Sequence, residues 1–397
     1  MTTHVFIVDA TTFKLHLEYL FAGTGAKKRN GENNEGYSID FNNNPITALH
    51  STTENMLVGM IADGSRIRRG DQIIFYLQQE FPKKIFEGKF YGIFKATDDW
   101  SFLDDYDEHQ YLNTELDKSL TFRTLIEPHK VYPEGVTEWE ALDEIKNMTS
   151  PNQMLWSLIY RKLKGNRGNT MITIYEAERL CQLIRGRNNR QELNISGHKL
   201  TFNQDDQKVI LTDDGASNYS GRKEGISLLP RLIAKYRADK SFETHLQAYI
   251  MRNIGKGINQ SLDDCILSEN LEFEWLGNEV SCGVGMQRID VMVSTTQNNQ
   301  RVLLPIELKS VEADIINTKQ IQRYIDWIEQ YYTPNRQSDI QPFLVSKRID
   351  NKTTERYQKI VDAFNDFNDQ NSRRCNNLKY IEYHLENDDL VFEKVNY

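Results

Sequence analysis

The chain has 397 residues, of which 39% are hydrophobic, 26% are charged and 11% are aromatic, and its formal net charge is −9 at pH 7. This composition argues against long disordered or fibrous segments, and the length is enough for two or three ordinary domains. No window approaches eighteen uninterrupted apolar residues, and residues 1–9 form a strand-like run without the apolar region of a signal peptide. We therefore expect a cytoplasmic protein without a membrane-spanning segment.

The four cysteines (Cys181, Cys265, Cys282 and Cys375) lie far apart and form no Cys-x-x-Cys pair. This usage is typical of a reducing compartment, and it argues against a zinc ribbon or a disulfide framework.

Charge is unevenly distributed along the chain. Residues 98–117 carry eight acids and no Lys or Arg, whereas residues 156–190 and 222–256 carry eight Lys or Arg each. A single basic stretch is often only a solvated helix face. Two such stretches in an acidic protein, however, favour local contact with a phosphate backbone.

Residues 1–147 predict a mixed α/β domain resembling a small barrel. Its helices are expected at residues 12–21 and from Thr137, where Thr and two acids indicate a helix N-terminus. A loop rich in Gly and Asn is expected at residues 23–44. Alternating or apolar runs predict strands at residues 5–8, 72–78, 89–96 and 122–131.

Residues 148–220 predict a basic connector. The pattern at 151–190 is helical with a basic loop broken by glycines, and residues 193–212 alternate like a hairpin with Asp205-Asp206 at its turn. Residues 213–220 are small and polar, which is typical of a linker.

Residues 221–397 predict a second α/β domain with a central sheet. The expected helices are at 241–253, 317–332 and 353–367, and the expected strands are at 271–276, 289–294, 302–308, 342–345 and 378–384.

Two of these strands carry unexpected charges. The apolar run 301–309 places Glu307 and Lys309 two residues apart, hence on one face, and Asp290 interrupts the preceding apolar strand. Burying such charges without a purpose is costly. If the strands are neighbours, Asp290 and Glu307 converge, and two carboxylates that close repel each other unless a cation lies between them. Hard oxygen ligands of this kind suit Mg²⁺.

Three further residues could join this centre. Glu243 begins an apolar helical stripe and could reach the same metal. Gln320 and Tyr324 are four residues apart, so they share one helix face and could contact the site or a nucleic-acid backbone. Lys309 could orient or help deprotonate an attacking water and offset charge on a phosphorane-like transition state.

An ordered set of residues resembles the motif of the PD-(D/E)XK phosphodiesterase superfamily: Glu243, Asp290, Glu307-Leu308-Lys309 and Gln320-x-x-x-Tyr324. The sequence around these residues is most similar to the RecB-like, NucS-type nuclease domains. The resemblance implies cleavage of phosphodiester bonds with Mg²⁺, for which Mn²⁺ can substitute. It also implies that Asp290, Glu307 and the Leu308 carbonyl hold the metal, that Lys309 is the catalytic lysine and that Glu243, Gln320 and Tyr324 assist.

The match covers residues 241–328, under a quarter of the chain. Ile289 stands where the superfamily motif has proline. The N-terminal region is also longer than in a NucS-type enzyme, so the mismatch-repair role of that family is not carried over with the fold.

The N-terminal runs 69–76, 88–97 and 122–128 are similar to PUA-like domains of the EVE and YTH kind, several of which hold a flipped base in an aromatic pocket. The alternative for each aromatic residue is core packing. The candidate pocket residues are Tyr76, Tyr91, Trp100 and Trp156, and the candidate DNA-contacting loop contains Arg161, Lys162, Lys164 and Arg167. The acidic run 98–117 is expected to face away from DNA or to contact a partner subunit.

The sequence therefore predicts a Mg²⁺-dependent DNA endonuclease, of the restriction or defence type, that acts on double-stranded DNA as a homodimer. The alternatives are a NucS-like repair endonuclease directed by structure or mismatch, and a nucleic-acid-binding protein with an inactive nuclease fold. RNA stays open as a substrate. Without a P-loop, Gly-x-Gly-x-x-Gly or Gly-x-Ser-x-Gly motif, we expect no bound nucleotide cofactor.

Overall fold

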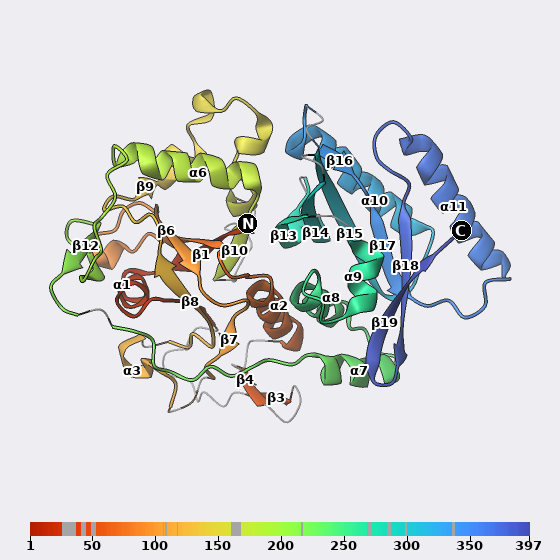
Figure 1. Cartoon of the computed structure of the whole chain (residues 1–397), viewed down its shortest axis with the longest axis horizontal. Helices are drawn as coiled ribbons and strands as arrows, with labels where there is room; N and C mark the ends of the chain where they lie inside the picture. Colours follow the sequence, from red (N-terminus) through yellow and green to blue (C-terminus); the bar gives the residue numbers. More distant parts are fainter. Residues whose placement is uncertain are drawn as a thin grey trace. The chain divides into compact units, whose positions relative to one another are not determined.

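The computed structural model describes residues 1–25, 53–105, 107, 109–116, 118–159, 168–215, 217–267, 272–283, 287–297, 300–335 and 338–397, and the backbone of strands at 37–40 and 45–48. The described residues have mixed α/β structure, as the sequence predicts. They form two compact units, Met1–Ile226 and Ser227–Tyr397 (Figure 1).

The first unit is built around one mixed sheet with the strand order β10-β1-β5-β6-β8-β2, to which β7 and β9 are added at β8 and β6. Its strands are β1 (Thr3–Val8), β2 (Phe21–Thr24), β3 (Tyr37–Asp40), β4 (Pro45–Ala48), β5 (Gln72–Leu77), β6 (Lys89–Ala96), β7 (Phe102–Leu103), β8 (Phe122–Pro128), β9 (Val136–Thr137), β10 (Asn169–Ile172), β11 (Lys199–Asn203) and β12 (Lys208–Thr212). Its helices are α1 (Ala10–Tyr19), α2 (Glu54–Ser65), α3 (Asn113–Leu116), α4 (Glu138–Leu142), α6 (Ile174–Arg187) and the short 3₁₀ turns η1 (Phe81–Lys83), η2 (Ile145–Asn147) and η3 (Pro151–Gln153).

Both faces of this sheet are covered by apolar side chains. Alternate residues of β1 go to opposite faces: Phe6 packs with α1 and the β11–β12 hairpin, whereas Val5 packs with α6. Figure 1 shows α6 running along one side of this sheet. A sheet buried on both sides has near-continuous hydrophobic strands, and β5 follows this pattern.

Residues 148–220 do not form the separate connector that the sequence predicts. Strand β10 pairs antiparallel with β1 and completes the sheet, so the helix expected throughout 151–190 is wrong at residues 169–172. The pairing partner of β10 lies more than 160 residues earlier, and helical periodicity within the segment carries no trace of it. The hairpin β11–β12 lies within the expected range 193–212, with Asp205 and Asp206 in its turn.

Helix α2 is absent from the sequence prediction because its two glycines lower helix propensity. Gly64 is required by packing, since a Cβ there would lie 2.8 Å from the Ser101 side chain. Most of the loop predicted at 23–44 lies outside the described residues. The helix expected from Thr137 is confirmed as α4, where Thr137 and Glu140 form a reciprocal capping box.

The second unit has a seven-stranded sheet with the order β13-β14-β15-β17-β18-β19, and β16 also pairs with β15. Its strands are β13 (Glu272–Ser281), β14 (Arg288–Gln297), β15 (Gln300–Glu312), β16 (Ser338–Ile340), β17 (Phe343–Lys347), β18 (Lys379–Glu386) and β19 (Asp389–Val395). Its helices are α7 (Leu229–Arg237), α8 (Glu243–Asn253), α9 (Gln260–Ile266), α10 (Ile316–Trp327), the π-helical turn η4 (Ile328–Tyr332) and α11 (Glu355–Asn371).

Helices cover both faces of the second sheet. Helices α7, α8 and α9 share one apolar core with the strand residues Ile306, Leu308 and Ile381. On the opposite face, Phe364 of α11 packs against Tyr380 of β18 with ring centroids 5.3 Å apart. Neighbouring residues of one strand thus go to different cores, and Glu307 of β15 points away from the core that Ile306 and Leu308 enter.

Within the part of the chain that the structure describes, no helix has both the length and the apolar character needed to cross a membrane.

Candidate active site

Asp290 and Glu307 face each other on neighbouring strands. Strands β14 and β15 are antiparallel, and their pairing ends with Val291 opposite Ile306. Asp290 and Glu307 are the next residue beyond that pair on each strand, and alternation places both on the face opposite to Val291 and Ile306. The Leu308 amide donates to Asp290 Oδ2 at 2.9 Å. The sequence expectation that the two carboxylates converge therefore agrees with the geometry.

Glu307 is enclosed by two donors. Its side chain is 1% exposed, with Oε1 2.5 Å from Lys309 Nζ. Its Oε2 accepts from the hydroxyl of Tyr324, which also lies 2.9 Å from the carbonyl oxygen of Arg288. Tyr324 is on α10, so this helix fixes the orientation of Glu307.

Glu243 approaches the same lysine from the other side. It is the first residue of α8, where the helix dipole stabilises a carboxylate. Its Oε2 lies 3.7 Å from Lys309 Nζ, and its side chain is 42% exposed. Four residues along, Gln247 donates from Nε2 to the carbonyl oxygen of Asp290 at 2.8 Å and so ties α8 to β14. The sequence analysis missed Gln247, although its spacing from Glu243 places both on one helix face.

The carboxyl groups of this centre are difficult to ionise together. Burial and the nearby negative charge of Glu307 raise the pKa of Asp290 well above 3.8. Burial also raises the pKa of Glu243, with the charge of Lys309 opposing that rise. Cys282, which the sequence analysis did not single out, has a pKa raised to about 12 by burial and by the charges of Glu307 and Asp290.

Lys309 is held as an ammonium ion. Burial alone would lower its pKa, but the charge and hydrogen bond of Glu307 and the charges of Glu243 and Asp290 outweigh burial and raise it. Three carboxyl groups therefore surround one permanent positive charge. This excess of negative groups is the electrostatic condition under which a divalent cation binds favourably.

The donor set fits a Mg²⁺ ion that keeps several waters. Asp290 uses only Oδ2 in a hydrogen bond with the described residues, and it is partly exposed, so Oδ1 is available as a ligand. Glu307 would have to give up one of its two partners. In the described ranges, no three His, Cys, Asp or Glu side chains form a group that could hold a metal by themselves. A site of two carboxylates therefore needs backbone, water or substrate oxygens as additional ligands.

Gln320 is not drawn into this centre. It is half-buried on α10, and its Oε1 accepts from Asn317 Nδ2 at 3.3 Å, one turn earlier on the same helix. Of the predicted pair Gln320 and Tyr324, only Tyr324 contacts the acids. Leu308 takes part through its amide, which orients Asp290.

Two of the aromatic residues proposed as a base pocket, Tyr76 and Tyr91, do not lie together. Tyr76 pairs with Phe90 and belongs to the core beneath α6, whereas Tyr91 pairs with Phe75 and belongs to the core beneath α1. They lie on opposite faces of the sheet, so one base cannot contact both. The cavity beside Tyr76 has a volume of about 20 Å³, room for about one water and far too little for a base.

Hydroxyl contacts confirm the core role of both tyrosines. Tyr76 donates to Glu138 Oε2 at 2.7 Å, and Tyr91 donates to the carbonyl oxygen of Gln207 at 2.7 Å. Trp100 and Trp156 are half-buried. The basic loop with Arg161, Lys162, Lys164 and Arg167 lies outside the described residues.

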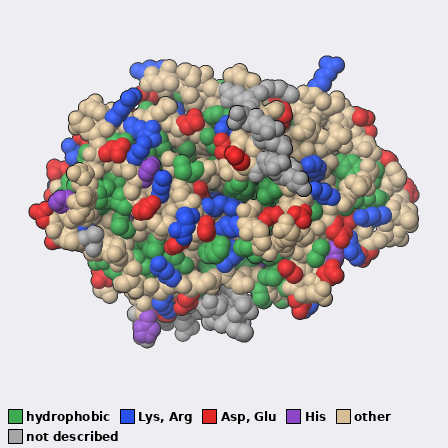
Figure 2. Space-filling model, viewed as in Figure 1, with side chains coloured by type: hydrophobic (Ala, Val, Ile, Leu, Met, Phe, Trp, Pro, Cys, Tyr) green, Lys and Arg blue, Asp and Glu red, His purple; other side chains and the backbone are tan. Residues whose placement is uncertain are grey.

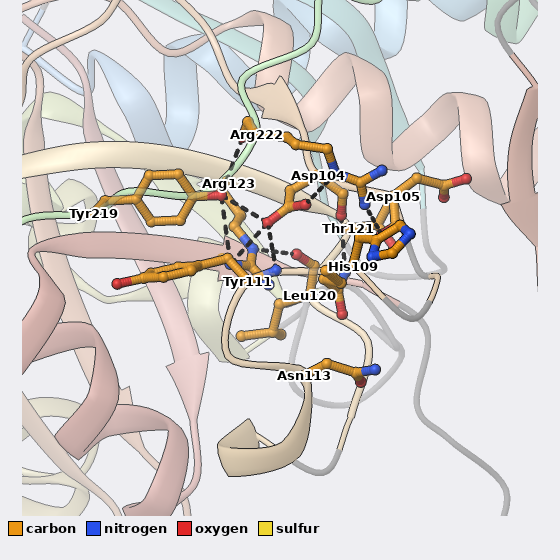
Figure 3. Close-up of polar contacts among 12 residues, drawn as sticks. Asp104, Asp105, His109, Tyr111, Asn113, Leu120, Thr121, Arg123, Tyr219 and Arg222 are labelled. Atoms are coloured by element: carbon orange, nitrogen blue, oxygen red, sulfur yellow. Dashed lines mark hydrogen bonds and ion pairs between the residues drawn. The ribbon is translucent and has the colours of Figure 1, made fainter.

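Two acids of the run 98–117, Asp104 and Asp107, are paired with arginines of their own unit. The expectation that the run faces away from DNA or contacts a partner subunit stays a prediction. Asp104 is fully buried and lies 3.1 Å from both Arg123 Nη1 and Arg222 Nε (Figure 3). Arg222 Nη1 also lies 2.8 Å from Asp107 Oδ2. Arg222, counted in the second basic stretch, is thus committed to acids. On the face shown in Figure 2, positive and negative side chains are interspersed.

Comparison with known proteins adds no relative: no family model matches this chain, and no curated protein matches it. The fold subtype and activity therefore rest on the residues themselves.

Proposed function

We propose that the second unit is a metal-dependent phosphodiesterase acting on nucleic acid, of the PD-(D/E)XK type. The observation that carries the proposal is that Asp290 and Glu307 lie on adjacent strands, with Asp290 accepting from the amide of Leu308 and with Lys309 Nζ 2.5 Å from Glu307. Two carboxylates on adjacent strands can hold a divalent cation, and a lysine beside them can stabilise negative charge that develops on the phosphate during hydrolysis.

Asp290, Glu307 and the Leu308 carbonyl would hold Mg²⁺ or Mn²⁺. When bound, the ion supplies charge to a phosphate oxygen and lowers the pKa of a water. The Leu308 amide and the Tyr324 hydroxyl orient the two carboxylates through hydrogen bonds to Asp290 and Glu307. This preorientation removes reorganisation from the reaction step.

Lys309 acts as a positive charge in this proposal. Because its pKa is raised, it stays protonated at neutral pH and donates hydrogen bonds to a developing phosphorane oxygen rather than accepting a proton. Glu243 is better suited to accept the proton of the attacking water, since its side chain is 42% exposed and burial raises its pKa.

The first unit would select the target. We propose double-stranded DNA as the substrate, a restriction or defence role, and a homodimer, because cutting two strands requires two such centres. Residues 148–226 belong to the first unit, so a truncation that tests its role must remove residues 1–226 as a whole. The truncated protein should keep metal binding and lose target selectivity.

The decisive experiment incubates the purified chain with Mg²⁺ and matched plasmids from methylating and non-methylating hosts. Asp290→Ala and Lys309→Ala are the test variants. Asp339→Ala, an exposed acid on β16, is the control. We expect discrete products from one plasmid with the wild type and the control, and at least about a 10³-fold loss with both test variants. Equal cleavage by all four proteins would refute this centre.

Two alternatives have distinct outcomes. Both oxygens of Glu307 already have donors, which favours a structural ion-pair network in a binding protein without activity. Binding of DNA without metal-dependent cleavage of any substrate would establish that alternative. Cleavage confined to mismatched or branched DNA would instead indicate a NucS-like repair endonuclease.

A further inference from the structure

An aliphatic ridge extends from the end of the proposed catalytic strand β15 to the start of α10. We define it by three side chains that are more than half exposed: Val311 at 61%, Ile315 at 52% and Ile316 at 56%. Val311 is two residues beyond Lys309, and Ile316 begins α10, the helix that carries Tyr324. Three large apolar side chains exposed within six residues of the chain are a candidate contact surface.

The ridge is held in place by hydrogen bonds. Asn317 Oδ1 accepts from the Asp314 amide at 2.7 Å, and Asp314 Oδ1 accepts from the Ile316 amide at 3.1 Å. Arg356 pairs with Glu312 and donates from Nη2 to the carbonyl oxygen of Ala313 at 3.3 Å. These hydrogen bonds fix the turn that carries Ile315 and Ile316, so their exposure is part of the folded structure.

Two cations extend the ridge along α10. Lys319 and Arg323 follow Ile316 by three and seven residues, a spacing that places all three on one helix face. Both are exposed, and neither has an acidic partner among the described residues. Arg323 directly precedes Tyr324, whose hydroxyl donates to Glu307, so the two cations lie on the helix that contacts the proposed centre.

We infer that the ridge is a wedge that opens a base step of double-stranded nucleic acid beside the cleaved phosphate, while Lys319 and Arg323 hold the flanking backbone. The inference rests on the proposed function. Aliphatic side chains inserted between base steps unstack them, and adjacent cations neutralise the phosphates that such bending brings close. The two unpartnered cations favour a polyanion over an apolar protein partner.

The test compares the full-length variant Ile315→Ser/Ile316→Ser with the wild type on two substrates. One is a fully paired duplex containing the mapped cut site, and the other is the same duplex with two unpaired bases at that site. We expect about a tenfold or greater loss on the paired duplex and less than about a threefold loss on the opened one. Ile258→Ser, which alters an isoleucine that is 55% exposed outside this surface, is the matched control.

The cations are tested by binding of a labelled duplex over a series of salt concentrations. Lys319→Gln/Arg323→Gln should reduce the magnitude of the slope of log affinity against log salt by about two. The control Lys359→Gln/Arg373→Gln, at exposed positions elsewhere in this unit, should reduce the magnitude of this slope less. Equal losses on both cleavage substrates would overturn the wedge. So would a wild-type dimer that the isoleucine variant converts to a monomer, because the ridge would then be a protein interface.

Failure of the proposed function gives a different pattern. If the wild type cleaves neither duplex, the catalytic proposal fails, and the salt series alone decides the surface. Salt-dependent binding of the duplex that is weakened both by Ile315→Ser/Ile316→Ser and by Lys319→Gln/Arg323→Gln would then support the contact surface. Unchanged binding in these two variants would overturn it.

Discussion

Two buried ionic clusters, one in each unit, differ in their balance of positive and negative groups. In the first unit, Asp104 lies between Arg123 and Arg222, and Tyr219 donates to its Oδ2 at 2.7 Å. In the second unit, Glu307 shares a single ammonium group, that of Lys309, with two other carboxyl groups. The first cluster balances the charges of Arg123 and Arg222 against those of Asp104 and Asp107. The second has an excess of carboxyl groups, and that excess marks it as a candidate cation site.

The comparison shows that burial of charge does not by itself identify a functional site. A matched buried pair ties chain segments together, here the acidic run and residues 219–222 (Figure 3). An unmatched cluster stores repulsion that only a bound cation or proton relieves. The two cases are separated by opposite responses to substitution, metal and pH.

The largest difference is expected for neutralising the central acid of each cluster. Asp104→Asn leaves Arg123 buried without its charge partner and should lower the free energy of unfolding by about 3 kcal/mol. Asp290→Asn removes a repelling charge, so in EDTA it should leave the free energy of unfolding unchanged or raise it. Urea unfolding measures the free energy of unfolding of both variants. As a control, Asp98→Asn, in the same acidic run as Asp104, should change this free energy by less than about 0.5 kcal/mol. Equal destabilisation by the two central substitutions would contradict the distinction.

Metal should stabilise only the second cluster. Mg²⁺ at about 100 times its dissociation constant is expected to raise the free energy of unfolding by about 2.7 kcal/mol. Asp290→Asn should abolish most of this gain, whereas Asp104→Asn should retain it. Thermal unfolding with and without Mg²⁺ measures the effect, and a gain that survives Asp290→Asn would place the ion elsewhere.

The two clusters should also respond to pH with opposite signs. The folded state raises the pKa of Asp290 above 3.8, so its contribution to stability is greatest below that pH and is lost as pH rises through the raised pKa. Burial would raise the pKa of Asp107, but the hydrogen bonds and charge of Arg222 outweigh it and lower the pKa below 3.8. The contribution of Asp107 is therefore lost as pH falls through that lowered pKa.

Urea unfolding in EDTA across this pH range measures both signs. Asp290→Asn should flatten the decline towards neutral pH, and Asp107→Asn should flatten the loss at acid pH. An unchanged profile in Asp290→Asn would mean that this carboxyl has no raised pKa.

The smallest effect separates the two residues of α10. Tyr324→Phe removes the donor to Glu307 and should lower kcat about tenfold, a loss typical of one hydrogen bond to a charged group. Gln320→Ala should change kcat by less than about threefold, because Gln320 contacts Asn317 rather than the acids. Equal losses would return Gln320 to the catalytic set.

Local patterns in the sequence determined much of the fold. Strand β6 spans the alternating run predicted at 89–96, and the capping box at Thr137 follows from residue spacing alone. The acids Asp290 and Glu307 were recognisable because each interrupts an apolar strand, where an unpaired charge is costly. These features depend on neighbours within a few residues, so a single sequence carries them.

Tertiary contacts decided what spacing could not. Strand β10 exists because β1 offers an open edge, and the sequence within 169–172 does not contain that partner. The opposite faces of Tyr76 and Tyr91 depend on the register of β5 and β6, and the commitment of Arg222 to Asp104 depends on segments more than 100 residues apart. Charge balance is a property of such long-range pairs. The sequence therefore determined which residues carry charge, and the folded structure decided which charges are matched and which are left in excess.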